Sequence, residues 1–187
     1  PMTALPIDPI LPDLVAALRA HGRAVLQAPP GAGKTTRVPL AMLKANDVQG
    51  RIIMIEPRRL ATRAAAERLA QTLDEPVGQS VGYRMRGDTC VSTKTRIEVV
   101  TDGILTRMLQ SDPDLKGIGA IIFDEFHERS LNADLALALA WEIRAVLRPD
   151  LQILVMSATL DAAPVAQMLD DAPILTSQGR AYPVTTH

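Results

Sequence analysis

The stretch from residue 27 to 39 combines residue types that can hold a phosphate group. It reads QAPPGAGKTTRVP and directly follows a short apolar run. Gly33, Lys34 and Thr35 complete the pattern G-x-x-x-x-G-K-[ST], although Ala28 stands where the pattern has its first glycine. In such a loop the backbone N–H groups surround a phosphate, the lysine reaches the outer phosphates and the hydroxyl binds Mg²⁺. A glycine-rich turn with a solvated lysine is the alternative, but an apolar run before the loop and a helical pattern after it favour nucleotide binding by Pro30, Gly31, Ala32, Gly33, Lys34, Thr35 and Thr36.

A second chemical signature lies in AIIFDEFHERS, residues 120 to 130. Its apolar run ends in two successive carboxylates, Asp124 and Glu125. Asp124 at a strand end can hold the hydration shell of Mg²⁺, and Glu125 can act as the general base that polarises an attacking water. An isolated Asp-Glu pair is usually a solvated strand end, but the phosphate loop upstream favours a catalytic role. We therefore predict Lys34, Asp124 and Glu125 as catalytic residues of NTP hydrolysis, with Mg²⁺ bound at Thr35 and Asp124.

These residues need a scaffold, and the chain alternates short β-rich runs with helical patterns. Continuous apolar runs such as AIIF and ILVM are typical of strands buried on both faces, as in a parallel sheet covered by helices. Repeated strand–helix alternation implies right-handed βαβ units. We therefore predict an α/β fold with a mostly parallel β-sheet and helices on both faces. The expected strands are 24–27, 51–56, 96–101, 120–124 and 152–157, and the expected helices are 34–43, 58–73, 103–109 and 131–147, after a leading helix that Gly22 ends.

The composition excludes several classes of protein. The 187 residues are 47% hydrophobic and 22% charged, which is normal for a soluble globular domain. Cys90 is the only cysteine, so no disulfide can form within the chain and a reducing, cytoplasmic location is expected. The longest apolar run has about seven residues, too few to span a membrane, and the proline-broken start is unlike a signal peptide. The net charge of −1 excludes a uniformly basic protein, but residues 51 to 107 carry ten Lys and Arg against seven Asp and Glu, so this part can face an anionic polymer.

Five motifs, in order, carry a resemblance to a known family. They are APPGAGKTT, EPRRLA, TDGIL, DEFH and SAT. From Pro12 to Val184 the chain resembles the DEAH-box helicases of superfamily 2, and DEFHERS, with Phe126 in place of alanine, looks most like the HrpB-type bacterial branch. The resemblance implies the first RecA-like P-loop NTPase domain of an ATP-dependent RNA helicase. It also implies ATP (or another NTP) and Mg²⁺ as cofactors, and RNA, with DNA as the alternative, as the partner.

The resemblance further implies roles for single residues near the nucleotide. Arg68 matches the arginine that stacks on adenine. A guanidinium plane does not distinguish donors from acceptors, so selection among bases is expected to be loose. His127, Ser157 and Thr159 match the relay between the ATP site and the nucleic-acid track. The hydroxyl groups of Ser157 and Thr159 can hydrogen-bond back to the acidic box, DEFH.

Nucleic-acid contacts are implied at three places in the chain. The resemblance assigns contacts with the phosphate backbone to the arginines of EPRRLA and to the residues of TDG. For Asp102, a helix N-cap is an equal alternative. Arg86 aligns with a family position near RNA and precedes an expected hairpin. The predicted contacts are Arg58, Arg59, Arg86, Thr101, Asp102 and Gly103.

The domain organisation and two rival functions complete the predictions. We divide the chain into an N-terminal extension with its leading helix (1–22), a RecA-like lobe (23–180) and the start of an inter-lobe connector (181–187). Nothing after Thr159 resembles the second RecA-like lobe, which carries the arginine fingers in this family, so that lobe is expected elsewhere in a longer protein.

One rival function is phosphate transfer to a small substrate, which SAT and TDG disfavour. The other is nucleotide binding without hydrolysis, which would not need Glu125.

Overall fold

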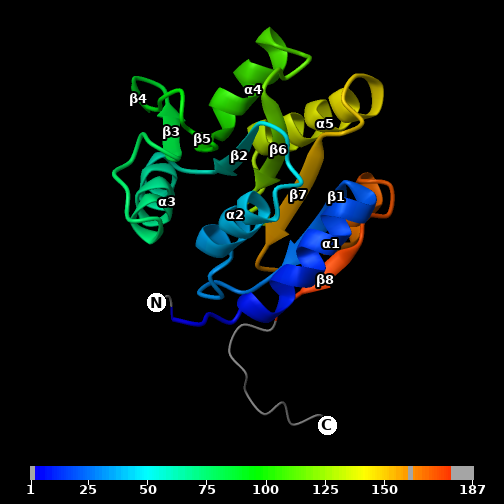
Figure 1. Ribbon diagram of the computed structural model, residues 1–187. Helices are drawn as coiled ribbons and strands as arrows, with labels where there is room; N and C mark the ends of the chain where they lie inside the picture. Colours follow the sequence, from blue (N-terminus) through cyan, green and yellow to red (C-terminus); the bar gives the residue numbers. More distant parts are fainter. Residues whose placement is uncertain (1–2, 160–161, 178–187) are drawn as a thin grey trace.

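The structure is a computed structural model, and it describes residues 3–159 and 162–177; the predicted connector at 181–187 lies outside these ranges. Within them, strands alternate with helices along most of the chain (Figure 1). The strands are β1 (Arg23–Gln27), β2 (Arg51–Glu56), β3 (Val81–Met85), β4 (Asp88–Cys90), β5 (Ile97–Thr101), β6 (Ile118–Phe123), β7 (Gln152–Ser157) and β8 (Ile174–Thr176). The helices are the 3₁₀ helix η1 (Asp8–Ile10) and α1 (Leu11–His21), α2 (Lys34–Ala45), α3 (Arg59–Thr72), α4 (Asp102–Ser111), α5 (Leu131–Val146) and α6 (Ala162–Met168).

The described strands form one sheet in the order β4-β3-β5-β2-β6-β7-β1-β8. Each neighbouring pair is parallel except β3 and β4, which form an antiparallel hairpin. The loops that follow the parallel strands therefore all leave from the same edge of the sheet, which we call the carboxyl edge; the opposite edge is the amino edge. Ligands bind at the carboxyl edge in open α/β sheets. The predicted mostly parallel sheet is confirmed.

Successive residues of the strands alternate between two hydrophobic cores. In β7, Leu154 and Met156 belong to a core that also contains buried side chains of α1, α2 and α3. Ile153 and Val155 belong to a second core with α4, α5 and α6. Figure 1 shows the strands between these helices. Apolar residues at every position of such strands are explained by this burial on both faces, as predicted.

The strands and helices expected from the sequence are all present, with ends shifted by at most two residues. The sequence analysis missed β3, β4, β8 and α6. β4 and β8 have only three residues each, and β3 reads VGYRM, so none of them carries a clear periodic pattern. Arg86 was expected before the hairpin, but it lies in the turn between β3 and β4 because β3 already begins at Val81.

The described N-terminal segment packs against the phosphate loop and the core. Ile7 is fully buried, and its N–H donates to the carbonyl of Ala32 at 3.0 Å. Leu14 and Leu18 of α1 join the same core. α1 ends at Gly22, whose φ of 73° is left-handed, as expected from the sequence. Among the described residues, no helix has both the length and the apolar character that crossing a membrane requires.

Candidate active site

The loop between β1 and α2 depends on glycine at two positions. β1 lies between β7 and β8, so it delivers the loop to the carboxyl edge of the sheet. Gly31 and Gly33 have φ angles of 83° and 95°, which residues with a Cβ atom rarely adopt. A Cβ on Gly33 would also lie 2.5 Å from Leu5 Cδ1. Gly33 is the N-cap of α2 and Lys34 its first residue, so the unpaired N–H groups at the start of α2 face the loop.

Two polar contacts join the phosphate loop to the acidic pair. Thr35 Oγ1 donates to Asp124 Oδ2 at 2.8 Å, and Lys34 Nζ donates to Glu125 Oε1 at 2.7 Å. Lys34 Nζ also lies 3.9 Å from Asp124 Oδ1. Lys34 and Asp124 are 4% and 5% exposed, so their charges interact away from bulk water. The structure therefore brings together the residues that the sequence analysis selected from two distant stretches.

A cavity of about 270 Å³ lies at this cluster. Arg68 reaches it from α3, so the residue predicted to stack on adenine borders the same space as the phosphate loop. Ala32 is buried in the loop and is not among the residues that border the cavity. Those residues are Pro30, Gly31, Gly33, Lys34, Thr35, Thr36, Arg68 and Glu125.

His127 connects Glu125 to the backbone that follows β7. His127 Nε2 lies 3.1 Å from Glu125 Oε2, and His127 Nδ1 accepts the N–H of Ala158 at 3.1 Å. Because Nδ1 is an acceptor, a neutral His127 carries its proton on Nε2, where it can donate to Glu125. Glu125 has a φ of 54°, a left-handed conformation that residues other than glycine seldom adopt. Lys34 and His127 each contact one oxygen of the Glu125 carboxylate.

The expected hydroxyl contacts of the motif SAT are wrong. Ser157 Oγ and Thr159 Oγ1 lie 3.2 Å apart, and Ser157 Oγ accepts the N–H of Thr159 at 3.3 Å. The backbone makes the contacts with the acidic stretch instead, through the N–H of Ala158 and through the N–H of Phe126, which donates to Met156 O at 3.0 Å. The reason is that β6 and β7 are neighbours in the sheet, so their pairing continues into the segments beyond them.

Glu56 is a third carboxyl group at this site, and the sequence analysis gave it no role. It ends β2, which pairs with β6, and it is only 3% exposed. Burial, a hydrogen bond with Asp124 and the negative charges of Asp124 and Glu125 raise the pKa of Glu56 far above its ordinary value, although Lys34 opposes this shift. Its Oε2 atom is buried without a hydrogen-bond partner among the described residues. The sequence did hold a signal, because RIIMIE is an apolar strand that ends in a carboxylate.

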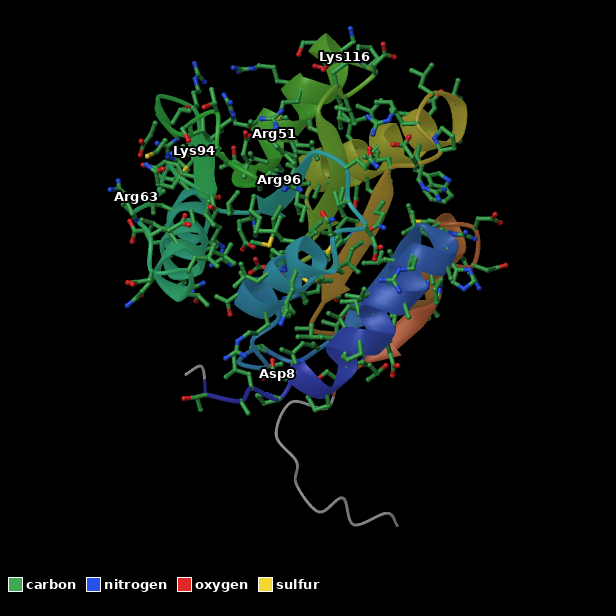
Figure 2. The ribbon with its side chains drawn as sticks, in the orientation of Figure 1. Asp8, Arg51, Arg63, Lys94, Arg96 and Lys116 are labelled. Carbon is green, nitrogen blue, oxygen red and sulfur yellow. The ribbon has the colours of Figure 1, made fainter. Side chains whose placement is uncertain are left out.

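The predicted nucleic-acid contacts on α3 lie at the carboxyl edge. Arg58 is the N-cap of α3 and Arg59 is its first residue. Arg59 Nη1 donates to the carbonyl of Arg86 in the β3–β4 turn at 2.8 Å, so α3 and the hairpin place three exposed arginines near one another. Arg63 has a different position: Figure 2 shows it on the outer side of α3, where it pairs with Glu67 at 3.1 Å.

The residues of TDG lie at the start of α4. Thr101 is the N-cap, with an extended backbone, and Asp102 is the first helical residue. The alternative of Asp102 as N-cap is therefore wrong by one residue, because β5 includes Thr101. Asp102 Oδ1 accepts the N–H of Gly103 at 2.8 Å, and Asp102 Oδ2 accepts from Ser130 Oγ at 3.1 Å. The contact with Ser130 joins this motif to the acidic stretch and was not expected from the sequence.

Comparison with known proteins places the chain among helicases. The family model described as DEAD/DEAH box helicase matches residues 10–168. The ATP-dependent RNA helicase HrpB of Escherichia coli (strain K12) is 54% identical over 183 residues, which are 98% of this chain and 23% of HrpB. The ATP-dependent RNA helicase HrpA of the same organism is 39% identical over 181 residues, which are 96% of this chain and 14% of HrpA. The higher identity with HrpB supports the predicted branch.

Two crystal structures of E. coli HrpB have the same fold as this chain. One is described as a DEAH/RHA helicase and the other as a DExH-box NTPase. Both give a TM-score of 0.92, at 54% and 53% identity, over 97% and 98% of this chain and 23% of each HrpB chain. The predicted helicase-type α/β fold is confirmed, and the chain spans less than a quarter of the relatives that it matches.

Proposed function

Because the chain belongs to the DEAD/DEAH box helicase family, we propose that it is the nucleotide-binding motor lobe of an ATP-dependent RNA helicase. One observation carries the proposal: the contacts of Lys34 with Glu125 and of Thr35 with Asp124 lie side by side, at 2.7 and 2.8 Å. They combine a phosphate-binding lysine, two oxygen ligands for a metal and a general base at one site. The site lies at the carboxyl edge of a parallel sheet, where such folds bind ligands.

The nucleotide proposed for the cavity is ATP or another NTP. The N–H groups at the start of α2 and the ammonium group of Lys34 suit its phosphates. Thr35 and Asp124 offer the oxygen ligands that Mg²⁺ prefers, and Mg²⁺ supplies charge neutralisation on the phosphate oxygens when bound. Arg68 borders the cavity and offers a stacking surface for the base.

Glu125 is the proposed general base for the attacking water. Its Oε1 faces Lys34 and its Oε2 faces His127, so both contacts orient the carboxylate. His127 also binds the N–H of Ala158, which stands between Ser157 and Thr159. These contacts support the proposed coupling role of His127, Ser157 and Thr159, with the backbone at Ala158 as the connecting group.

The proposed nucleic-acid contacts lie on α3, the β3–β4 turn and the start of α4. They are Arg58, Arg59, Arg86, Thr101, Asp102 and Gly103. Exposed guanidinium groups and a helix N-terminus suit phosphates of either RNA or DNA. The choice of RNA rests on the relatives, which are named RNA helicases. Contacts of this kind give weak, salt-sensitive binding with little base specificity.

A second RecA-like lobe elsewhere in a longer protein is part of the proposal. This chain covers 23% of HrpB and 14% of HrpA, so both relatives are at least four times longer. We propose residues 23–180 as the first lobe, preceded by an extension at 1–22 and followed by a connector from 181. Arginine fingers on the second lobe would contribute a factor of about 10³ to 10⁵ to the rate of hydrolysis. We also propose a cytoplasmic location, because the sequence has a single cysteine and so forms no disulfide within the chain.

Phosphate release from NTP by this chain tests the proposal. We expect slow hydrolysis that RNA does not stimulate, and RNA-stimulated hydrolysis when the chain is joined to the remainder of an HrpB-like protein. Glu125→Gln should abolish hydrolysis and keep nucleotide affinity, whereas Glu142→Gln, an exposed carboxylate on α5, should change neither.

The two rival functions give different results in the same assay. An enzyme that phosphorylates a small substrate would need an acceptor other than water for turnover. A module that only binds nucleotide would release no phosphate, either alone or joined to the remainder of an HrpB-like protein. Glu125→Gln and the wild type would then give the same result in the assay. Full RNA-stimulated turnover by the 187 residues alone would contradict the need for a second lobe.

A further inference from the structure

The segment from Asp124 to Ser130, which we call the acidic loop, contacts both the nucleotide cavity and the starts of α3 and α4. At its beginning, Asp124 and Glu125 contact the phosphate loop. At its end, Glu128 forms an ion pair with Arg58, and Ser130 Oγ donates to the carboxylate of the TDG motif. Glu128 therefore places a negative charge against a residue that is proposed to bind phosphate.

The ion pair between Arg58 and Glu128 is accessible to solvent. The guanidinium Nη2 and the carboxylate Oε1 are in direct contact, and the two side chains are 70% and 35% exposed. Exposed pairs of this kind contribute little to folding stability, because water and salt screen them. A phosphate group can bind the same guanidinium with the same charge-assisted geometry. The carboxylate and the phosphate therefore compete for Arg58.

We propose that Glu128 is a positioning residue that occupies Arg58 and lowers the affinity of this lobe for nucleic acid. The inference rests on the proposed function, in which Arg58 binds a phosphate of the nucleic acid. Arg59 differs, because its guanidinium is held by the carbonyl of Arg86, a neutral acceptor that leaves the positive charge uncompensated. Glu128 therefore controls one of two adjacent arginines and leaves the other available.

The backbone of the acidic loop connects Glu128 to the nucleotide cavity. The N–H of Glu128 donates to the carbonyl of Glu125 at 2.9 Å. Glu125 is left-handed, and its side chain is held by Lys34 and His127. Nucleotide phosphates compete with Glu125 for Lys34, so they bias the conformation of the turn that carries Glu128. Nucleotide then changes nucleic-acid affinity through Glu128, and nucleic acid changes nucleotide affinity by the same factor.

The affinity of the Glu128→Gln variant for fluorescein-labelled oligouridylate tests this inference. Glutamine keeps the size of the side chain and removes its charge. We expect binding at low salt, without nucleotide, to tighten about two- to fivefold, the range in which exposed ion pairs act. Arg58→Ala should weaken binding and reduce the salt slope by about 0.7. Glu128→Gln should bring no gain in the Arg58→Ala background, because the two residues act on one contact.

A matched control removes one negative charge from α3 instead of from the acidic loop. Glu67→Gln breaks the pair with Arg63 on the outer side of the helix and should leave the affinity unchanged. Adding ADP and magnesium should change the affinity of the wild type more than that of Glu128→Gln, a difference that a merely structural role of Glu128 would not produce. The temperature of unfolding, measured for each variant, confirms that the fold is kept.

The outcomes separate this inference from the proposed function. If Arg58→Ala weakens binding while Glu128→Gln matches the wild type, the role of Glu128 is overturned and the proposed function stands. If Arg58→Ala has no effect, the proposed phosphate contact is wrong and the inference falls with it. If Glu128→Gln and Glu67→Gln tighten binding equally, the effect is one of overall charge and the specific competition is overturned.

Discussion

The two edges of the sheet differ in what most of their cationic side chains contact. At the carboxyl edge, Lys34 faces two carboxylates at a cavity, and arginines at the starts of α3 and in the hairpin turn are exposed. At the amino edge, several guanidinium groups donate to backbone carbonyls, although Arg51 also pairs with Glu98 and Arg148 with Asp150. Arg96 donates to Gly50 O at 3.1 Å, Arg144 donates to Leu151 O at 2.8 Å, and Arg148 donates to Leu115 O and Ile118 O, each at 2.8 Å.

The difference separates function from stability within one sheet. Loops at the amino edge carry carbonyl groups outside the regular hydrogen bonding of helices and strands, and fixed arginine donors bind them. Loops at the carboxyl edge keep charges that bind other charged groups, so a ligand can compete for them. The same residue type therefore stabilises the fold at one edge and remains available for ligands at the other.

Lys34→Ala should give the largest functional effect at the carboxyl edge. It removes the charged donor of the phosphate loop, and hydrogen bonds to charged groups are worth about 1.5–3 kcal/mol. We expect nucleotide affinity to fall about a hundredfold, or about 2.7 kcal/mol, in a calorimetric titration. Lys44→Ala, an exposed lysine on the same helix, should leave the affinity unchanged. Equal nucleotide affinity of the Lys34 variant and the wild type would contradict the claim that charges at the carboxyl edge bind ligands.

Arg148→Ala should give the largest effect on stability at the amino edge. It leaves the carbonyls of Asp114, Leu115 and Ile118 without this donor, and we expect the free energy of unfolding to fall by about 2–3 kcal/mol. Nucleotide affinity should not change, because the site lies at the other edge. Arg19→Ala removes an exposed arginine whose partner among the described residues is Asp47, and it should lower the free energy of unfolding much less in the same denaturant titration, because solvent screens this pair. A loss of nucleotide affinity in Arg148→Ala would mean that the two edges are coupled.

Arg59→Ala should have a smaller effect, limited to nucleic acid. Removing one phosphate contact should weaken binding of labelled oligouridylate about three- to tenfold and lower the salt slope by about 0.7. Lys94→Ala is the matched control, because Lys94 is an exposed cation of the hairpin region that lies towards the amino ends of the strands. Equal weakening in both variants would show that nucleic acid is attracted by overall charge and not by the carboxyl edge.

The sequence predicted the layers of the fold and selected the main residues of the candidate nucleotide site because each rests on a local pattern. Apolar runs identified the buried strands, and the spacing of Gly33, Lys34 and Thr35 identified the loop. Short paired strands such as β4 and β8 escaped because their formation depends on a neighbour in space. The position of Asp102 inside α4 was missed for a different reason, since helix ends are set by the last residues of the preceding strand.

Contacts between distant residues were the part that the sequence did not reveal. Glu56 is near in space to Asp124 only because β2 and β6 pair, and its burial follows from helices on both faces of the sheet. The pair of Arg58 with Glu128 joins α3 to the acidic loop, and no spacing rule relates the two positions. The left-handed conformation of Glu125 was also not expected, because glutamate does not favour it.

Asp150→Asn should give the smallest effect, and it shows which contacts of Arg148 matter. Asp150 accepts from Arg148 at 3.0 and 2.9 Å, and this hydrogen bond lowers the pKa of Asp150 below its ordinary value of 3.8, although partial burial opposes the shift. A carboxylate with a lowered pKa contributes stability above its unfolded pKa and loses that contribution as the pH falls through the folded pKa.

The stability gap between wild type and Asp150→Asn should therefore be present at neutral pH and disappear below the pKa of the carboxylate. Asp150 is 63% exposed, so solvent screening limits the gap to less than about 1 kcal/mol. In the Arg148→Ala background the same substitution should cost nothing, because its partner is absent. A cost as large as that of Arg148→Ala, measured by denaturant unfolding, would mean that Arg148 acts through its ion pair. The amino edge would then rely on paired charges as the carboxyl edge does, and the distinction between the edges would fail.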